Sequence, residues 1–394
     1  MDAFYSQTKP RIQEYCGLRS EESPGLDCEF LVARGAGEAP FRFTGNQDLD
    51  AILEGGDDIY RSLWSRRSSL FFLDLEFKNT QDPREIYRNG PDLFRRTLEP
   101  IYQELCGLLA ACGLSFLSVI TATGYHCVFA VPFETGEHAR LESLGRPCQE
   151  LMEQYARVPQ VSHRSRPVPH STALAFDGLG RLAEFLAKTI RPAADVPVAA
   201  GIQHPRQVLL DLSTFADPLH LRFIRCVGSY HQKSGQPYAT LIRREANGVE
   251  HPLEDLLSVY GWPLRAAKRI CSTPARIPSA GHGLQDLMDQ YLASELRRRH
   301  TAFDLSQPSS GDLENARKLL QGFQDHELAE DRGLKRAVQL GRCKGLHSRS
   351  IGMAVAERYR QAAWDSPIMA WHTESHDGYN PTSRALFWSR LYAS

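Results

Sequence analysis

The sequence predicts an α+β protein, in which a mixed sheet flanked by helices is followed by a smaller all-helical domain. Three observations lead to this prediction. Apolar segments of strand length alternate with helical patterns up to about residue 245. A stretch rich in Pro, Ser and Gly follows at 271–283. Beyond it, apolar residues recur only at helical spacing. We therefore expect a large α+β domain at 1–271, a linker at 272–283 and a helical domain at 284–394.

The elements of the first domain follow from local patterns, taken in chain order. Strands are predicted at 29–36 and 40–45 as a hairpin, and then at 70–77, 115–120, 121–132, 208–213 and 236–243. Helices are predicted over most of 48–64 and at 91–111, 137–155 and 179–190, with a proline-broken loop at 161–170. The β-α-β-β order around 70–132 predicts that helices cover one face of a mixed sheet.

Composition limits the class of protein. The chain has 394 residues, enough for two domains with cores of their own. Its formal net charge of -1 gives no overall attraction to nucleic acid, so any such binding must rest on a local basic patch. The N-terminus lacks the apolar core of a signal peptide, and no segment has the roughly 18 apolar residues of a membrane span. We therefore expect a soluble, cytoplasmic protein with no membrane partner.

Cysteine spacing argues against several kinds of site. Nine cysteines are scattered through the chain without a C-x-x-C pair. An odd number without paired spacing predicts free thiols, and dispersed cysteines do not suit an iron–sulfur cluster. Cys148, His163 and His170 lie in one region, but their spacing fits no standard zinc finger.

The segment LFFLDLEFKN at 70–79 is the most informative stretch of the chain. Asp74 and Glu76 stand two positions apart, so on a strand both carboxylates point to the same face. They repel each other unless a cation lies between them, and Mg²⁺ or Mn²⁺ suits hard oxygen ligands. The alternative is an edge strand whose polar face lies in water. Because the run before Asp74 is apolar on both faces, as in a buried central strand, a metal site is favoured.

The segment TATGYHCVFAVP at 121–132 places His126 shortly after Gly124. A glycine lets the backbone approach a ligand closely, and Tyr125 could pack beneath the site. The imidazole could donate a hydrogen bond to a phosphate oxygen. The alternative is a core histidine whose hydrogen bonds are satisfied within the protein.

A third carboxylate, Asp211, ends the apolar run VLLDLS at 208–213. The following loop at 224–238 has two glycines, Gly228 and Gly235, which allow tight turns around an anion. Its donors suited to phosphate oxygens are Arg225, Ser229, His231 and Lys233. The alternative is a polar hairpin connection with a solvated lysine.

Taken together, these segments resemble the archaeo-eukaryotic primase superfamily, also called prim-pol enzymes. The motifs that carry the resemblance are hhhDhE at 71–76, T-x-x-G-Y-H-h-h-F at 121–129, hhhD at 208–211 and R-x-x-G-S-x-x-x-K-x-G at 225–235. They follow the family's order and strand context, and the match covers roughly residues 25–245. Family members often have a serine two places before the histidine, where this chain has Gly124.

The resemblance implies a primase-polymerase fold for the first domain and the activity of a DNA primase-polymerase. The implied catalytic metal ligands for Mg²⁺ or Mn²⁺ are Asp74, Glu76 and Asp211. The implied triphosphate contacts are His126, Arg225, Ser229 and Lys233, and the loop's chemistry adds His231. In the implied two-metal nucleotidyl transfer, a 3′-hydroxyl attacks the α-phosphate of an NTP or dNTP on a single-stranded DNA template. A helicase or other replication protein is expected as a separate partner, because the chain contains no G-x-x-x-x-G-K-[ST] motif.

The helical domain contains two conspicuous groups of residues. Between 332 and 360 the basic residues are Arg332, Lys335, Arg336, Arg342, Lys344, Arg349, Arg358 and Arg360, against Glu357 alone. Such a patch suits a nucleic-acid backbone, or it pairs with the nearby acids Glu327, Glu330 and Asp331. The aromatic and histidine residues near the C-terminus are Trp371, His372, His376, Tyr379 and Trp388, which either stack on bases or form core. Prim-pol proteins often carry a small helical domain here that assists priming, so a template or initiating-nucleotide site is implied.

Two other classes of function remain open. A metal-dependent nuclease of a mobile element or defence system could use the same acids, although it would have no triphosphate for the loop at 225–235 to bind. A catalytically silent replication-initiator protein that binds DNA would have no use for the three carboxylates.

Overall fold

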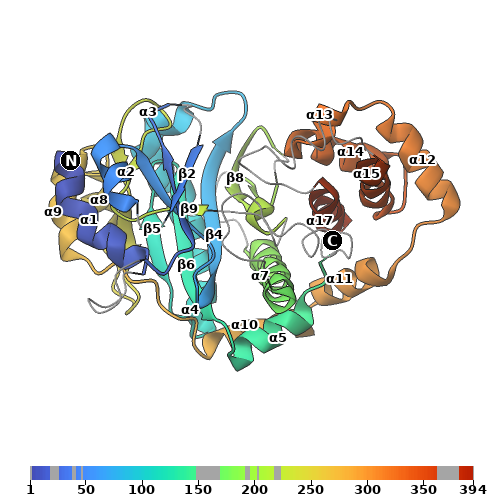
Figure 1. Ribbon diagram of the computed structural model, residues 1–394, viewed down its shortest axis with the longest axis horizontal. Helices are drawn as coiled ribbons and strands as arrows, with labels where there is room; N and C mark the ends of the chain where they lie inside the picture. The colour runs from blue at the N-terminus through green and yellow to red at the C-terminus, as the bar shows by residue number, and fades with distance from the viewer. Residues whose placement is uncertain are drawn as a thin grey trace. The chain divides into compact units, whose positions relative to one another are not determined.

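The computed structural model describes residues 2–17, 26–37, 41–45, 48–147, 169–190, 196–201, 204–216, 223–361 and 381–393 (Figure 1). Contacts divide the chain into two compact units. We call the first the sheet unit; it comprises Met1–His138, Leu186–Leu212 and Arg222–Leu287. We call the second the helical unit; it comprises Ala139–Phe185, Ser213–Leu221 and Met288–Ser394.

This division differs from the one that composition predicts. The Pro-, Ser- and Gly-rich stretch expected as a linker lies within the sheet unit, where it is bonded to a strand. The N–H of Ala130 donates to the carbonyl of Pro278, and the N–H of Ala280 donates to the carbonyl of Ala130. Residues 139–185, expected in the first domain, belong to the helical unit instead. Both differences arise from contacts between residues far apart in sequence, which local composition does not report.

A six-stranded mixed sheet forms the centre of the sheet unit, as predicted. Its strand order is β12 (Leu241–Arg244), β5 (Leu117–Ile120), β6 (Gly124–Pro132), β4 (Ser68–Asn79), β8 (Arg206–Leu210) and β7 (Val198–Ala199). Only the β7–β8 pair is parallel. The long strand β4 lies between β6 and β8, so the apolar run of the sequence is a central strand and not an edge.

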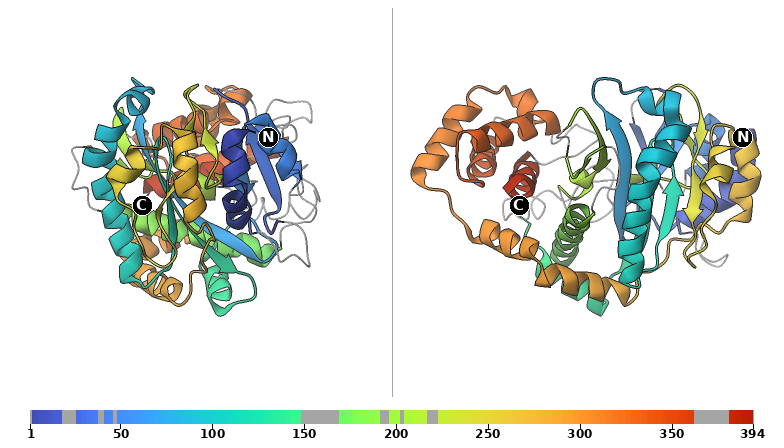
Figure 2. Two further views of the ribbon diagram at one scale, coloured as in Figure 1. Left: turned by 90° about the vertical axis from the view of Figure 1, so that its left-hand side faces the viewer. Right: turned by 180° about the vertical axis from the view of Figure 1, so that it is seen from behind.

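Helices cover one face of this sheet, again as predicted. The pattern expected at 91–111 is resolved into α3 (Glu85–Leu93), a π-helical turn η1 (Phe94–Leu98) and α4 (Glu99–Ala111). Figure 2 shows α4 running along the sheet in its right-hand view. Tyr102 of α4 stacks on Tyr125 of β6 with ring centroids 4.2 Å apart, and Phe94 meets the same ring edge-on at 5.4 Å. This contact identifies the helix-covered face as the one that carries Tyr125.

A second sheet has the strand order β2 (Phe41–Gly45), β1 (Phe30–Arg34), β3 (Asp58–Ser62) and β9 (Phe223–Arg225). The predicted hairpin is confirmed as β1 and β2. The prediction of a helix over most of 48–64 was wrong for its second half: α2 ends at Gly55, and β3 follows. Gly56 adopts the left-handed conformation that terminates a helix, with φ of 66°. Every residue of β3 is buried, although Asp58, Arg61 and Ser62 are polar.

The remaining elements of the sheet unit are short. They are α1 (Ala3–Tyr15), β10 (Tyr230–His231), β11 (Tyr238–Ala239), α8 (Leu253–Leu257), α9 (Pro263–Ser272) and the first part of α10 (Gly283–Ala293). The predicted strand at 236–243 is therefore present as β11 and β12, interrupted at Thr240. The predicted strand at 208–213 ends at Leu210, so Asp211 follows β8 instead of lying within it.

The helical unit is built almost wholly from helices, as its pattern predicts. They are α5 (Gly136–Leu144), α7 (His170–Thr189), α11 (Glu295–Leu305), α12 (Ser310–Leu320), α13 (Asp325–Leu328), α14 (Asp331–Cys343), α15 (Ser350–Gln361) and α17 (Pro381–Ala393), with a 3₁₀ turn η2 (Leu212–Phe215). Helix α15 packs against α12 and α17, and α17 also packs against α14. Trp388 is completely buried, so its interpretation as core is confirmed.

Some sequence predictions lie partly or wholly outside the described residues. The helix predicted at 137–155 is described only as far as Leu144, and most of the loop predicted at 161–170 is not described. The same holds for Trp371, His372, His376 and Tyr379, and for Cys148 and His163. Within the described ranges, none of the helices is both long enough and apolar enough to cross a lipid bilayer.

Candidate active site

Strand β4 presents a row of charged side chains on one face. Asp74, Glu76 and Lys78 alternate with the buried residues Leu75 and Phe77, as the period of a strand requires. Leu75 is opposite Tyr125 in the β4–β6 register, and Tyr125 packs against α4. The charged row therefore lies on the opposite face of the sheet from α4.

Asp211 joins this row from the neighbouring strand. Leu210 is the last residue of β8 and pairs with Leu75, and the next N–H, that of Asp211, donates to the carbonyl of Asp74 at 2.8 Å. The segments 70–77 and 208–213 thus bring their acids together, as the sequence predicts. The electrostatics agree, because the carboxylate of Asp211 acts on Asp74 strongly enough to raise its pKa.

The carboxyl of Asp74 is held in an environment that opposes its charge. Burial raises its pKa well above the usual value, and the carboxylates of Glu76 and Asp211 raise it further. Lys78 and Lys233 act in the opposite direction. Three carboxylates and two ammonium groups are thus close enough to interact. Ionised Asp74 lowers the stability of the folded protein unless a cation compensates it.

His126 lies directly across from Asp74 in the β4–β6 register. Its Nε2 is 3.6 Å from Oδ1 of Asp74, and its ring meets Phe72 edge-on at 4.9 Å between centroids. Burial, and secondly the charge of Arg225, lower the pKa of His126 to about 3. The imidazole is therefore neutral at physiological pH and can donate one N–H. Its Nδ1 has no hydrogen-bond partner among the described residues.

Gly124 has a different role from the one that the sequence suggested. It lies opposite Glu76 in the register, and a Cβ built on it would stand 1.9 Å from the carbonyl oxygen of Leu75. The glycine is thus required by the close approach of β6 to β4. A serine at this position cannot be accommodated without moving one of the two strands.

We expect Gly124→Ser to destabilise the protein by about 2 kcal/mol or more, because the added Cβ forces the paired strands apart. The matched control is Gly107→Ser on α4, where a Cβ would meet no atom within 4 Å. Chemical denaturation of the two variants measures the difference. Equal stability of both would show that β4 and β6 are not so closely paired.

Two of the predicted loop donors are held by protein partners. Arg225 is buried and donates to Asp58 at 2.5 Å, to the hydroxyl of Tyr60 and to the carbonyl of Tyr230. The hydroxyl of Ser229 accepts the N–H of Ile59 at 2.7 Å and donates to the carbonyl of Tyr230 at 3.0 Å. Both residues therefore position the loop. Arg225 still adds positive potential to the site, since it lowers the pKa of His126 and of His231.

The other two loop residues have different surroundings. His231 is buried, and its Nδ1 accepts the N–H of Ala122 at 3.3 Å. Its pKa is lowered by burial first and then by Arg225, Lys233 and His126. Lys233 is exposed in part, but its ammonium group loses hydration, which lowers its pKa, and Glu76 acts in the opposite direction. The loop thus brings a lysine close to Asp74, Glu76 and Asp211, which we call the acid row.

Several residues of the site were not anticipated from the sequence. Lys78 continues the period-two row, and its Nζ is 3.4 Å from Oε1 of Glu76. Its position could have been predicted from the same strand period that identified Asp74 and Glu76. Asp58 anchors the loop by pairing with Arg225 and by accepting the N–H of Gln232 at 3.1 Å. No local signal identifies this residue, because its partners are distant in sequence.

The donor chemistry of the site fits a divalent cation with oxygen ligands. Asp74, Glu76 and Asp211 are hard ligands whose mutual repulsion a cation would relieve. The side chains of Asp74 and Glu76 are 28% and 19% exposed, so an ion could reach them. Within the described part of the chain, no set of three or more His, Cys, Asp or Glu side chains already stands in metal-binding geometry. Binding would therefore require the carboxylates to converge.

The basic patch of the helical unit is partly neutralised. Arg358 pairs with Asp325 at 2.5 Å, and Arg336 lies 3.7 Å from Glu327. Lys335 lies over the ring of Trp388 at 3.9 Å. The remaining exposed cations on and just beyond α14 are Arg332, Arg342 and Lys344. The patch is therefore smaller than the sequence suggested.

Comparison with protein-family models found no match to this chain, and comparison with curated proteins found no similar sequence. The geometry described above and the motifs of the sequence are therefore the grounds for a functional assignment.

Proposed function

We propose that this protein synthesises primers and extends DNA by nucleotidyl transfer from NTP or dNTP on a single-stranded DNA template. The observation that supports this proposal best is the gathering of Asp74, Glu76 and Asp211 on one face of the sheet, next to Lys233 and His126. Acids beside neutral and cationic donors can serve a reaction in which a triphosphate binds, a hydroxyl attacks and pyrophosphate leaves.

In this proposal the acids and the donors have separate tasks. Asp74, Glu76 and Asp211 would hold Mg²⁺ or Mn²⁺, which when bound activates the attacking 3′-hydroxyl and stabilises the leaving pyrophosphate. Lys233 is exposed on a loop that Arg225 and Ser229 hold in place, so it can reach a triphosphate without a large rearrangement. His126 is neutral and can donate an N–H to a phosphate oxygen.

Lys78 compensates the acid row in the absence of a metal ion. Its pKa is raised, first by Glu76, and its ammonium group also interacts with Asp211 and Asp74. A lysine in this place reduces repulsion in the free protein and competes electrostatically with an incoming cation.

We expect Lys78→Met to tighten Mn²⁺ binding by ~3- to 10-fold, because a competing positive charge is removed. It should also lower the melting temperature of the metal-free protein slightly. Titration calorimetry with MnCl₂ measures the affinity, and Lys318→Met, a solvated lysine of the helical unit, is the control. Weaker Mn²⁺ binding by Lys78→Met would show that Lys78 organises the acids instead of competing for them.

The direct test is primer synthesis on unprimed single-stranded DNA with labelled NTPs or dNTPs and Mg²⁺ or Mn²⁺. We expect products from the wild type and none from Asp74→Ala/Glu76→Ala. The nucleotide dependence of the products would show which sugar is preferred. Absence of product, even with a supplied primer, would overturn the proposal. Metal-dependent degradation of the template would instead identify a nuclease. Unchanged DNA binding by the double variant, with no synthesis by either protein, would identify a silent DNA-binding module.

A further inference from the structure

The helical unit contains a cavity of about 410 Å³, and all of its lining residues belong to this unit. Its apolar walls come from η2, α11, α15 and α17, through Phe215, Phe303, Met353, Leu386 and Phe387. Arginines Arg146, Arg349 and Arg390 also line it. The cavity is thus lined by both apolar and charged side chains, and its volume is within the range of small-molecule sites.

Arg349 supplies a positive charge that lacks a carboxylate partner. Its Nη1 donates to two backbone carbonyls, those of Asp304 and Ser306, at 2.8 Å each. Its Nε is buried and has no hydrogen-bond partner among the described residues. No carboxylate lies within ion-pair distance of this guanidinium in the part of the chain that the structure describes. A buried charged donor without a partner is costly, so an anion at this place would stabilise the unit.

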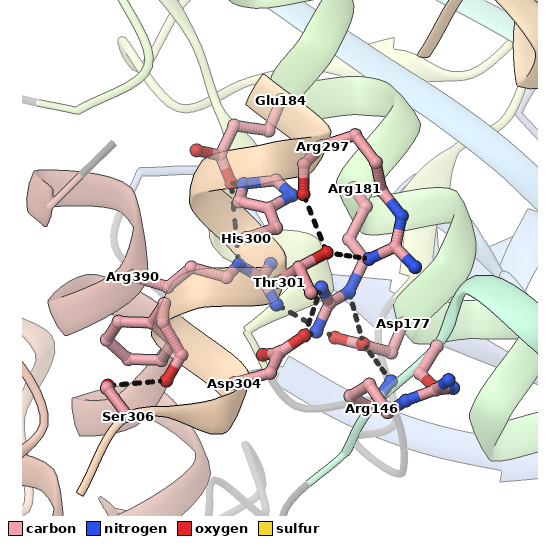
Figure 3. A network of polar contacts seen from close by, with 12 residues as sticks. Arg146, Asp177, Arg181, Glu184, Arg297, His300, Thr301, Asp304, Ser306 and Arg390 are labelled. Atoms are coloured by element: carbon pink, nitrogen blue, oxygen red, sulfur yellow. Dashed lines mark hydrogen bonds and ion pairs between the residues drawn. The ribbon is translucent and has the colours of Figure 1, made fainter. Parts of the chain in front are cut away.

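Arg390 supplies a second incompletely bonded guanidinium. Its side chain is only 6% exposed and lies 3.3 Å from Asp177 and 3.5 Å from Glu184. Figure 3 shows it beside the pair formed by Asp177 and Arg181. Nη2 of Arg390 is buried and lacks a hydrogen-bond partner among the described residues. Arg349, which directly precedes α15, and Arg390 of α17 thus bring donors with unused capacity to the same cavity.

The charges around the cavity leave an excess of one positive charge. Among the lining residues, Arg146, Arg349 and Arg390 carry three positive charges, and Asp177 and Asp304 carry two negative ones. The acids are already engaged, because Arg181 pairs with Asp177 at 2.9 Å and with Asp304 at 2.8 Å. His300 adds no charge at neutral pH, since burial lowers its pKa. The unbalanced charge favours an anionic ligand over a cationic one.

We propose that this cavity binds a small organic anion, with an oxoanion head held by Arg349 and Arg390 and an apolar body packed between Phe303 and Phe387. The guanidinium fork suits the paired oxygens of a phosphate or carboxylate. The aromatic walls contribute by burying the body of the ligand. This site is independent of the nucleotidyl transfer proposed above, because it lies in the other unit and uses no residue of the acid row.

The test is titration calorimetry of the full chain with phenyl phosphate, inorganic phosphate, benzoate and phenol. We expect saturable binding of phenyl phosphate or benzoate, at least ~10-fold weaker binding of inorganic phosphate, which lacks the body, and no measurable binding of phenol, which lacks the charge. Phenyl phosphate and benzoate differ only in the head, so their ratio shows which oxoanion the arginines prefer. No saturable binding of either would overturn the proposal.

Two variants locate the binding. Arg349→Gln should weaken binding by ~10-fold or more, because a charged donor is lost, whereas Arg317→Gln, an exposed arginine paired with Glu357, should leave it unchanged. Ala356→Leu keeps every charge but fills part of the cavity that Ala356 lines, so it should also abolish binding. If Arg349→Gln does not fold, the Ala356→Leu variant alone tests whether the ligand binds in this cavity. Unaltered binding by Ala356→Leu would place the ligand elsewhere and overturn the proposal.

Discussion

Replacing Asp74 with Asn is expected to abolish nucleotide incorporation and, at the same time, to raise the melting temperature of the metal-free protein. The two effects have one cause. The carboxylate is placed where burial and the charges of Glu76 and Asp211 oppose its ionisation. Asn removes that cost, and it also removes the negative charge that a metal ion would need. We expect the activity to fall by ~10³-fold or more, the scale of losing a principal source of electrostatic stabilisation of the transition state.

The pH dependence of the stability difference follows from the direction of the shift. A carboxyl whose folded-state pKa is raised is neutral in both folded and unfolded states below about pH 4, so it then has no effect on stability. As the pH rises past the unfolded value, the unfolded state ionises more readily and the wild type loses stability. The gap in melting temperature between Asp74→Asn and wild type should therefore be absent below about pH 4 and widen towards neutral pH, by about 2–4 °C for each kcal/mol.

Thermal denaturation with and without MnCl₂ completes this test. Mn²⁺ should raise the melting temperature of the wild type, because a ligand of the folded state stabilises it by mass action, and should have little effect on Asp74→Asn. The control is Asp255→Asn, which alters a carboxyl that is 53% exposed and 3.6 Å from Arg269. It should change neither activity nor the response to Mn²⁺. A lower melting temperature for metal-free Asp74→Asn would show that Lys78 and His126 stabilise the carboxylate more than its neighbours repel it.

The acids of this site could be predicted from the sequence because strand periodicity carries the necessary information. Asp74 and Glu76 share a face as a direct result of their spacing, and Asp211 follows an apolar run that reads as a neighbouring strand. The phosphate donors were less predictable. Ser229 is one of the loop's polar residues in the sequence, yet its hydroxyl is used to hold β3. Which polar group faces a ligand and which one anchors a loop depends on partners far along the chain.

The division into two units could be predicted less well from the sequence than the helices and strands themselves. A segment rich in Pro, Ser and Gly usually joins domains, but here its backbone is bonded to Ala130 of β6. Conversely, α7 precedes β8 in the chain, and most of it belongs with helices more than a hundred residues later. The reason is a set of ion pairs from Arg181 and Asp177 to Asp304 and Arg390. Such pairs are formed by the tertiary structure and leave no local pattern.

These ion pairs lead to the second prediction with a large effect: Arg181→Met should destabilise the helical unit by about 3–5 kcal/mol. The arginine side chain is completely buried, and it pairs with Asp177 at 2.9 Å and with Asp304 at 2.8 Å (Figure 3). Burial alone would raise the pKa of Asp177, but Arg181 and then Arg390 outweigh it and lower that pKa below its usual value. Without the arginine, the carboxylates of Asp177 and Asp304 are no longer fully compensated. The methionine fills much of the same space, so the expected loss comes mainly from charge.

Urea denaturation measures this loss, with Arg317→Met as the matched control. Arg317 also pairs with a carboxylate, that of Glu357 at 2.7 Å, but its side chain is 46% exposed, so its loss should cost less than about 1 kcal/mol. Adding Asp304→Asn to Arg181→Met should recover part of the stability, because one of the abandoned charges is removed. If the single variant were as stable as Arg317→Met, the ion pairs would not hold α7 to α11. If the second substitution lowered stability further, the loss would come from packing and not from uncompensated charge.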